Sequence, residues 1–296
     1  MTNTAKVGNF RYRILALLIY ATTVNYFDRS ILGAMSPTLM DVFNWTNNDY
    51  SNITIAFQVA YAIGMLSMGG IIDRLGTKKG YTLAIGTWSF FGMSHVLALK
   101  IGAIFAPIVQ TIGKLFGAPG TMPASAIGFS VTRFGLAFGE SGHFPSAQKT
   151  VAEWFPKKER AFATGLYNAA TSIGAIAAPF VVGWIVHAET GKGWQIPFLI
   201  TGGLSAIWII LWQKTYKKPE DHPKLSAEEL KYINSDSVVE NTEKISWKKV
   251  LPKRQTWAFA LAKMTDAVWW FYLFWGAIFL HDKFDVSIKE IGLPFL

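Results

Sequence analysis

Two oppositely charged residues, Arg133 and Glu140, stand in the otherwise apolar stretch TRFGLAFGESGHFP. Seven residues make about two helical turns, so both side chains would share one helix face about 10 Å apart. A substrate, a water molecule or a group from another helix must therefore lie between them. An arginine at such a place would hold a carboxylate through two hydrogen bonds, and a buried glutamate would take up and release a proton. The alternative is structural: Arg133 only neutralises Asp28 or Glu140 and locks the helices together.

Two further apolar stretches each carry one cation and one anion. NYFDRS contains Asp28 and Arg29, and AKMTDAVWWFYLFW contains Lys263 and Asp266. An ionisable group in a membrane span costs about 2.5–3.5 kcal/mol on insertion scales, so such groups usually face a cavity or a partner. We therefore expect the three stretches to form an internal polar network.

Further candidates for substrate contacts are polar or aromatic residues in apolar surroundings, namely Tyr61, Asn168, Trp269, Trp270 and Tyr272. The Tyr61 phenol can donate to a substrate oxygen, and the aromatic group around Trp270 can stack on a sugar ring or gate a cavity. Ordinary alternatives exist for each: a packing aromatic for Tyr61, an interhelical hydrogen bond for Asn168, and an aromatic belt at the membrane surface for the others.

Two loop segments combine acidic and basic residues. GGIIDRLGTKK supplies Gly69, Asp73, Arg74 and Gly76, and AEWFPKKERAFATG has a similar mixture. Both segments join apolar stretches at the expected water interface. We interpret them as a salt-bridge latch between helices and not as substrate contacts.

The elements that must position these residues are apolar runs long enough to cross about 30 Å of hydrocarbon. The sequence predicts seven spans, at Ile14–Leu39, Tyr50–Ile72, Tyr81–Leu99, Ala124–Phe144, Ala161–His187, Trp194–Trp212 and Trp257–Leu280. Residues 282–296 are expected to lead into an eighth helix that the chain does not complete. Residues 101–122 are apolar but contain Pro107, Gly113 and Lys114. We predict a re-entrant or interfacial excursion there, because a full crossing would invert every later loop.

The composition favours a membrane protein over a soluble one. Of the 296 residues, 51% are hydrophobic and 16% are charged, against about 25% charged in typical soluble domains. The net charge of +9 follows the expected topology, since 20 of the 28 Lys and Arg residues fall in joints on the side of the N-terminus and four on the other. The positive-inside rule then predicts a multi-pass membrane protein with a cytoplasmic N-terminus. Charge distributed in this way does not indicate nucleic acid as a partner.

Other classes of site find little support in the sequence. It contains no cysteine, and its five histidines are scattered. No metal-ligand spacing, phosphate loop or nucleophile–base arrangement occurs, so we expect neither an enzyme nor a metal site nor a bound cofactor. The lipid bilayer and a small anion are the expected partners, and no obligate protein partner is evident.

Three segments follow from these patterns: 1–212 as a six-helix transmembrane domain, 213–256 as a cytoplasmic linker, and 257–296 as helix seven with the beginning of a second transmembrane domain. The linker should contain a short surface helix with Ser226 as its cap. We interpret the linker charges simply as solvation.

Several stretches together resemble a known family: NYFDRS, PTLMDVF, RFGLAFGESGHFP, AEWFPKKERAFATGLYNAATSIGAIAAP and DAVWWFYLFW. They are similar to the anion:cation symporter branch of the major facilitator superfamily, and within it to bacterial hexuronate transporters. The likeness runs from about Tyr20 to Leu280. GGIIDRLGTKK resembles the family's loop between helices two and three, with Thr77 where an arginine is usual. Residues 101–122 depart from the family, whose joint at this point is shorter.

The resemblance implies an all-α membrane bundle of twelve helices in two halves, of which this chain would hold the first half, helix seven and the start of helix eight. It implies proton-coupled import of a hexuronate or similar sugar acid by alternating access, with protons as the coupling ion. The family's proton-handling carboxylates fall on Asp28 and Glu140, its anion-binding residue on Arg133, and its helix-two contact on Tyr61. Arg29 matches the basic residue of helix one and would help to hold the carboxylate. The alternatives are a transporter of another organic anion, such as an aldonate or an aromatic acid, and a truncated remnant that does not transport.

Overall fold

The computed structural model describes residues 8–115, 122–187, 190–236, 247–265, 267–287 and 289–292. Within these ranges all regular elements are helical. The α-helices are α1 (Arg11–Phe43), α2 (Asn47–Leu75), α3 (Thr77–Ser94), α4 (Ala98–Leu115), α5 (Ala124–Glu140), α6 (His143–Trp154), α7 (Lys157–Ile185), α8 (Gln195–Thr215), α9 (Ala227–Ile233), α10 (Trp247–Val250), α11 (Arg254–Met264) and α12 (Ala267–Phe284). Short 3₁₀ turns cover His95–Leu97 and Pro219–Asp221.

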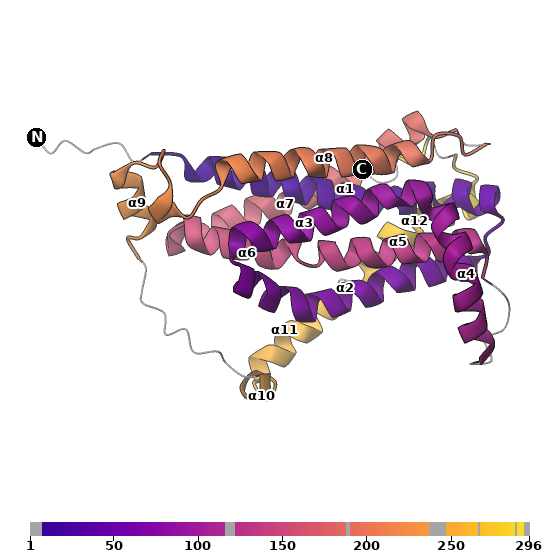
Figure 1. Ribbon diagram of the computed structural model, residues 1–296, viewed down its shortest axis with the longest axis horizontal. Coiled ribbons are helices and arrows are strands. Elements are labelled where there is room, and N and C mark those ends of the chain that lie inside the picture. The colour runs from indigo at the N-terminus through magenta and orange to yellow at the C-terminus, as the bar shows by residue number, and fades with distance from the viewer. Residues whose placement is uncertain are drawn as a thin grey trace, which may run out of the picture.

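The long helices lie side by side along the long axis of the molecule, with α9 at one end and α4 at the other (Figure 1). Two of them organise the bundle: α1 packs on α7, α8 and α12, and α5 packs on α2, α3 and α4. Close backbone contact is possible where glycine faces a neighbouring helix. A Cβ atom on Gly33 would lie 2.5 Å from the carbonyl oxygen of Leu273, so α12 rests directly on α1.

Four helical stretches are long and apolar enough to cross a membrane: Asn47–Leu75, Thr77–Leu115, Lys157–Ile185 and Gln195–Thr215. The helices α1 and α5, which carry buried charges, fall outside this set. Both nevertheless lie in the centre of the bundle, so their charges are surrounded by the apolar helices. The first six expected spans correspond to α1, α2, α3, α5, α7 and α8.

The seventh expected span is not a single helix, so that prediction was wrong in one respect. The structure has two helices there, α11 ending at Met264 and α12 beginning at Ala267. The Thr265 hydroxyl donates to the carbonyl oxygen of Ala262 at 2.6 Å. Such local bonds compete with the helical hydrogen-bond pattern. Asp266, which the sequence placed in the polar network, lies outside the described residues.

The fourth expected span is also shorter than its apolar run. Helix α5 ends at Glu140, and a turn at residues 141–142 leads into α6. The Ser141 hydroxyl donates to the Phe138 carbonyl at 2.6 Å, which again satisfies a backbone group locally. Glu140 therefore occupies the last position of its helix, next to a break in the backbone hydrogen-bond ladder.

The segment predicted as an excursion begins as a helix. Following the turn at His95–Leu97, α4 leaves the direction of α3 and runs steeply away from the bundle (Figure 1). It crosses the start of α5 so closely that a Cβ atom on Gly102 would lie 1.8 Å from the Ala124 carbonyl oxygen. Residues 116–121 of this segment lie outside the described residues, and its position relative to a membrane stays a prediction.

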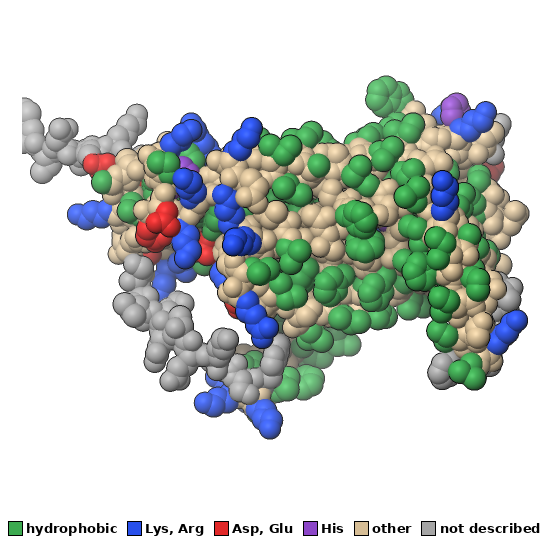
Figure 2. Space-filling view, in the orientation of Figure 1, with side chains coloured by type: hydrophobic (Ala, Val, Ile, Leu, Met, Phe, Trp, Pro, Cys, Tyr) green, Lys and Arg blue, Asp and Glu red, His purple; other side chains and the backbone are tan. Residues whose placement is uncertain are grey.

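Basic side chains gather around the end of the bundle that carries α9 (Figure 2). The predicted helix cap in this region is confirmed, because the Ser226 hydroxyl accepts the Glu229 backbone N–H at 3.1 Å. The interpretation of all linker charges as solvation was wrong. Glu229 is 1% exposed and pairs with Arg11 at 3.2 Å, while Arg11 also pairs with Glu159 at 2.9 Å. Arg11 thus ties α9 to the beginnings of α1 and α7.

A second contact at this end joins the linker to α7. The backbone N–H groups of Lys157 and Lys158 donate to the Asp236 carboxylate at 2.9 and 3.4 Å. The Lys157 bond, with support from that of Lys158, lowers the pKa of Asp236. An anion at a helix N-terminus is favourable because it satisfies otherwise unpaired donors.

Candidate functional site

Four charged side chains meet in the interior, two from α1 and two from α5. Asp28, Arg29 and Glu140 are 0% exposed and Arg133 is 1% exposed. We call these four residues the charged cluster. Two positive and two negative formal charges balance inside it. Removing four charges from water is costly unless they compensate one another. The balance of two positive and two negative charges is therefore what allows all four side chains to be buried together.

Arg29 supplies the group from another helix that the spacing of Arg133 and Glu140 required. Its Nε atom donates to Glu140 Oε2 at 2.5 Å. Arg133 Nη2 points to the backbone carbonyl oxygen of Arg29 at 3.5 Å. Arg133 therefore does not pair directly with Glu140, and the arginine of α1 occupies the interval between the two α5 residues.

Asp28 lies on the other side of the cluster. Its Oδ1 atom accepts a hydrogen bond from the Thr201 hydroxyl of α8 at 3.2 Å. It also interacts electrostatically with Arg133. A Cβ atom on Gly92 would lie 3.2 Å from Asp28 Oδ2, so α3 comes close to this carboxylate as well.

The cluster has more polar atoms than partners. Six of its buried atoms have no hydrogen-bond partner among the described residues: Asp28 Oδ2, Arg29 Nη1 and Nη2, Arg133 Nε and Nη1, and Glu140 Oε1. Buried polar groups are nearly always hydrogen-bonded, so atoms of this kind indicate a place for water or a ligand. Four of the six are guanidinium nitrogens. The excess is therefore one of donors, which suits an anion with several acceptor oxygens.

Aromatic rings cover the Arg29 guanidinium. Its Cζ atom lies 4.5 Å from the centre of the Tyr61 ring, 5.1 Å from that of Tyr26 and 5.2 Å from that of Trp270. Phe57 contacts both arginines, at 5.8 Å from Arg29 and 5.7 Å from Arg133. Cation–π contacts of this kind contribute about 0.5–2 kcal/mol each. Tyr61 and Trp270, both predicted from the sequence, thus lie directly against the cluster.

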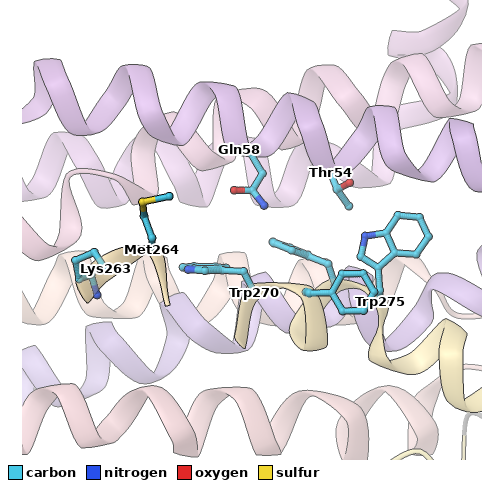
Figure 3. Close-up of a pocket in the computed structure, with 8 residues that line it drawn as sticks. Thr54, Gln58, Lys263, Met264, Trp270 and Trp275 are labelled. Carbon is cyan, nitrogen blue, oxygen red and sulfur yellow. The ribbon is translucent and has the colours of Figure 1, made fainter. Parts of the chain in front are cut away.

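A pocket opens beyond these rings, between α2 and the α11–α12 segment (Figure 3). Its volume is about 480 Å³, within the range usual for small-molecule sites. The lining residues are Thr54, Gln58, Lys263, Met264, Trp270, Phe271, Phe274 and Trp275. Trp270 belongs both to this pocket and to the aromatic cover of Arg29, so the two sites share a wall.

Helix α12 is held in place beside the pocket by α2. The buried Tyr50 hydroxyl donates to the Phe274 carbonyl oxygen at 2.7 Å, and the Tyr50 ring meets Trp275 edge to face at 5.2 Å. These contacts fix the aromatic face of α12 toward α2.

Two predicted contact residues, Asn168 and Trp269, are not brought to the cluster by any contact among the described residues. The Asn168 amide donates to the Thr164 carbonyl of its own helix at 2.9 Å. Trp269 is 45% exposed, Tyr272 is 36% exposed, and their rings lie 6.4 Å apart. On α12, successive side chains point in different directions, so only Trp270 of the predicted aromatic group faces Arg29.

The loop after α2 makes the type of contact expected of a latch. Asp73 pairs with Lys149 of α6 at 2.8 Å, and Arg74 is exposed. Gly76 joins α2 to α3 with a positive φ of 77°, a conformation that favours glycine. A Cβ atom on Gly69 would meet nothing within 4 Å, so close packing against a neighbouring helix does not explain why this residue is a glycine.

Thr77, where the resemblance led us to expect an arginine, also makes a contact of the latch type. Its hydroxyl donates to Glu153 Oε1 at 2.6 Å, and the Tyr216 hydroxyl donates to the other oxygen of the same carboxylate. Glu153 therefore links α3, α6 and the end of α8.

His143 stands beside Phe144 and Pro145 at an expected helix end, where the sequence favours a structural role over a catalytic one. It is 0% exposed and lies between the Thr22 and Tyr81 hydroxyls, at 2.9 Å from each, so it joins α1, α3 and α6. The pocket residues Thr54 and Gln58 were not among the predicted site residues. Their spacing with Tyr61, at i, i+4 and i+7, places all three on one face of α2 and is the signal that could have identified them.

Comparisons with known proteins agree with this geometry. Residues 18–296 match the Major Facilitator Superfamily. The chain is 31% identical over 293 residues to the galacturonate transporter of Dickeya chrysanthemi, covering 97% of this chain and 77% of that one. It is likewise 31% identical over 293 residues to the hexuronate transporter of Escherichia coli strain K12, covering 97% of this chain and 61% of that one.

A solved structure shares the fold. The crystal structure of a bacterial homologue of the human lysosomal transporter Spinster, inward-facing and unoccupied, matches with a TM-score of 0.69 at 19% identity, over 98% of this chain and 59% of that one. The match to the superfamily covers nearly the whole sequence. The chain therefore belongs to the Major Facilitator Superfamily and is an integral membrane protein of a transporter family, not an enzyme.

Proposed function

We propose that the chain supplies the substrate-binding site of a proton-coupled importer of hexuronates such as glucuronate or galacturonate. The observation that carries the proposal is the charged cluster, which is fully buried and has four guanidinium nitrogens without a hydrogen-bond acceptor among the described residues. The similarity to galacturonate and hexuronate transporters supports a sugar acid as the anion.

In this proposal the carboxylate of the sugar acid binds to Arg133 and Arg29. Guanidinium groups bind carboxylates through parallel charge-assisted hydrogen bonds, and both arginines have nitrogens available for them. The Tyr61 phenol beside Arg29 donates to a substrate oxygen, and the Trp270 ring provides an apolar surface for the sugar.

Coupling to protons follows from the competition for Arg29. The Glu140 carboxylate already pairs with this arginine at 2.5 Å, so an arriving carboxylate must share or displace it. Protonation of Glu140 removes its negative charge and releases Arg29 for the substrate. Proton binding and substrate binding therefore favour each other, and by linkage the effect is reciprocal.

Charge balance gives the same result. The cluster is formally neutral, and a singly charged sugar acid would leave one uncompensated negative charge in a buried site. One proton on Glu140 or Asp28 restores neutrality. The loaded cluster can then pass through the inward transition without moving net charge, so in this proposal the pH difference across the membrane drives uptake.

The basic end of the molecule, with α9 and the latch, is the cytoplasmic end in this proposal (Figure 2). By the positive-inside rule the N-terminus then lies on the cytoplasmic side of the membrane. The similarity to bacterial transporters supports a bacterial inner membrane as its location. The chain contains no cysteine, so single cysteines can be labelled without background. We expect a membrane-impermeant maleimide to label Lys114→Cys in intact cells and to label Lys157→Cys only after lysis. Labelling of both positions from the outside would contradict this orientation.

Uptake by proteoliposomes tests the function. With the complete gene product reconstituted, an inward proton gradient should accumulate labelled glucuronate at least about tenfold above vesicles without a gradient, which is the effect of about 1.4 kcal/mol of driving force. Accumulation of labelled galactonate or benzoate in place of glucuronate would identify another organic anion as the substrate. Lack of gradient-dependent uptake of any of them would contradict the proposal.

A further inference from the structure

We propose that buried polar side chains of α1, α6 and α7 hold a chain of water molecules through which the coupling proton passes from Glu140 to the cytoplasmic end. The residues that hold this chain are Asn25, Ser146, Trp154 and Tyr167, and we call them the polar column. This inference rests on the proposed function and adds to it the route by which the proton leaves.

The buried polar atoms that lack a hydrogen-bond partner are distributed unevenly along the bundle. Among the described residues, six belong to the charged cluster and five to the polar column, namely Asn25 Nδ2 and Oδ1, Ser146 Oγ, Trp154 Nε1 and Tyr167 Oη. The one remaining atom of this kind in the described part of the chain is His95 Nε2. All four residues of the column are 0% exposed. Buried water is what usually satisfies such groups, so the column indicates water inside the helix bundle.

The column lies between the charged cluster and the end of the molecule that carries α9 (Figure 1). Asn25 precedes Asp28 on α1, which begins at that end. Ser146 and Trp154 follow Glu140 on α6, which runs toward that end, and Tyr167 is ten residues from the start of α7. The unpartnered groups therefore extend from the cluster in one direction, toward the basic side of the protein.

Asn25 lies next to Glu140, between two observed contacts. It follows Thr22 by three residues and precedes Arg29 by four, so the three side chains share a face of α1. Thr22 contacts His143 at 2.9 Å, and Arg29 pairs with Glu140. The Asn25 amide thus faces the turn between α5 and α6. Glu140 Oε1 also lacks a partner among the described residues, and one water molecule between it and this amide would satisfy both.

Beyond the turn, the column continues along one face of α6. The polar or aromatic residues of this face follow one another at intervals of three or four and are all 0% exposed: His143, Ser146, Thr150 and Trp154. On the neighbouring α7, the Tyr167 ring lies 6.5 Å from that of Phe144 at the start of α6. Its hydroxyl therefore adds a polar group to the same region.

Trp154 brings the column to the basic end. Its ring lies 5.7 Å from that of Phe10, just before α1, and 5.6 Å from that of His222 in the linker. The column therefore reaches the contact between the N-terminal segment, the linker and α6, where the expected cytoplasmic solution begins.

His143 holds this arrangement in place without carrying charge. The Thr22 hydroxyl donates to the Leu18 carbonyl oxygen at 2.9 Å, so it accepts a hydrogen bond from His143 Nε2. His143 Nδ1 is then the acceptor of the Tyr81 hydroxyl at 2.9 Å. Both nitrogens of the neutral ring are occupied, which makes His143 a positioning residue that fixes α6 against α1 and α3.

Proton transfer along the water chain leaves no charge behind. The O–H bond of protonated Glu140 breaks as the nearest water molecule accepts the proton, and each water molecule passes one of its own protons to the next. The last one gives its proton to the cytoplasmic solution, and the Glu140 carboxylate regains its pair with Arg29. The side chains of the column hold the water molecules by hydrogen bonds and keep their own protonation states.

Asn25→Leu tests the step next to Glu140, because it keeps the size of the side chain and removes both unpartnered atoms. In proteoliposomes with the complete gene product, gradient-driven uptake of glucuronate should slow at least about tenfold, within the range by which positioned proton transfer accelerates reactions. Exchange of labelled for unlabelled glucuronate needs no net proton transfer and should change by less than about twofold. In D₂O the variant's uptake should slow further, because proton transfer then limits the rate, and its exchange should not.

Ser30→Ala is the matched control. Ser30 lies on the same helix, is buried, and donates its hydroxyl to the Tyr26 carbonyl oxygen of that helix at 2.9 Å. This variant should take up glucuronate like the wild-type protein. Asn25→Ser should restore most of the rate, since a small hydroxyl side chain can still hold a water molecule.

Tyr167→Phe provides a second test that is safe for folding, because it removes only a hydroxyl without a partner among the described residues. It should melt like the wild-type protein and slow gradient-driven uptake but not exchange. Wild-type uptake in both Asn25→Leu and Tyr167→Phe, or equal losses of uptake and exchange, would overturn the proton route and leave hexuronate transport intact. Failure of the wild-type protein to accumulate glucuronate would overturn both the route and the proposed function.

Discussion

Arg133→Gln should weaken glucuronate binding by at least about 30-fold. Removing one partner of a buried, hydrogen-bonded charge pair costs about 2–5 kcal/mol, and 2 kcal/mol corresponds to about this factor. Arg133 is 1% exposed and has two nitrogens without a partner among the described residues. The substrate carboxylate is the partner that we assign to them. Isothermal titration with the purified complete protein measures the effect.

Loss of a buried arginine also threatens folding, because Asp28 would lose its electrostatic partner. Arg133→Lys addresses this concern, since it keeps the charge but not the planar fork that grips a carboxylate. We expect this variant to elute as a folded monodisperse species and to bind about tenfold more weakly or worse. Arg13→Gln, at an exposed position near the start of α1, is the control and should bind normally. Wild-type affinity in either Arg133 variant would remove Arg133 from the site.

Glu140→Gln should abolish proton-driven accumulation while leaving substrate binding intact. Glutamine resembles protonated glutamate in shape and charge, so it leaves Arg29 without its ionised partner and free for the substrate. Gradient-driven uptake should fall to the level of vesicles without a gradient, whereas exchange of labelled for unlabelled glucuronate should continue. Wild-type affinity should rise as the pH is lowered, because protons release Arg29, and the variant's affinity should not depend on pH.

Glu228→Gln is the matched control for this experiment, because Glu228 lies exposed on α9 at the water interface. It should accumulate glucuronate like the wild-type protein. Accumulation of wild-type size in Glu140→Gln would mean that another group, with Asp28 as the first candidate, carries the coupling proton. Loss of exchange as well as accumulation would mean that Glu140 is needed to bind substrate.

The sequence predicted the participants of the charged cluster better than their pairing. Because Arg133 and Glu140 are seven residues apart, it was clear that something must lie between them, and charge in apolar stretches pointed to Asp28 and Arg29. The periodicity of a single helix shows which of its residues share a face. It does not specify which face of α1 meets α5, so the Arg29–Glu140 pair became visible only with the packing of the helices.

The sequence could not decide which aromatic residues of helix seven face the cluster. Trp269, Trp270 and Tyr272 are equally good candidates by type, but the rotation of α12 brings only Trp270 against Arg29. Glu229 illustrates the same limit at the other end of the molecule. A glutamate in a polar linker is normally solvated, and its burial against Arg11 depends on where α9 docks.

The central claim is that the charged cluster binds a sugar acid and a proton together. The most direct measurement is the number of protons taken up when glucuronate binds to the purified complete protein in a weakly buffered solution near neutral pH. The charge balance of the cluster predicts uptake of about one proton per glucuronate in the wild-type protein and none in Glu140→Gln. Glucuronate binding without proton uptake in the wild-type protein would contradict it.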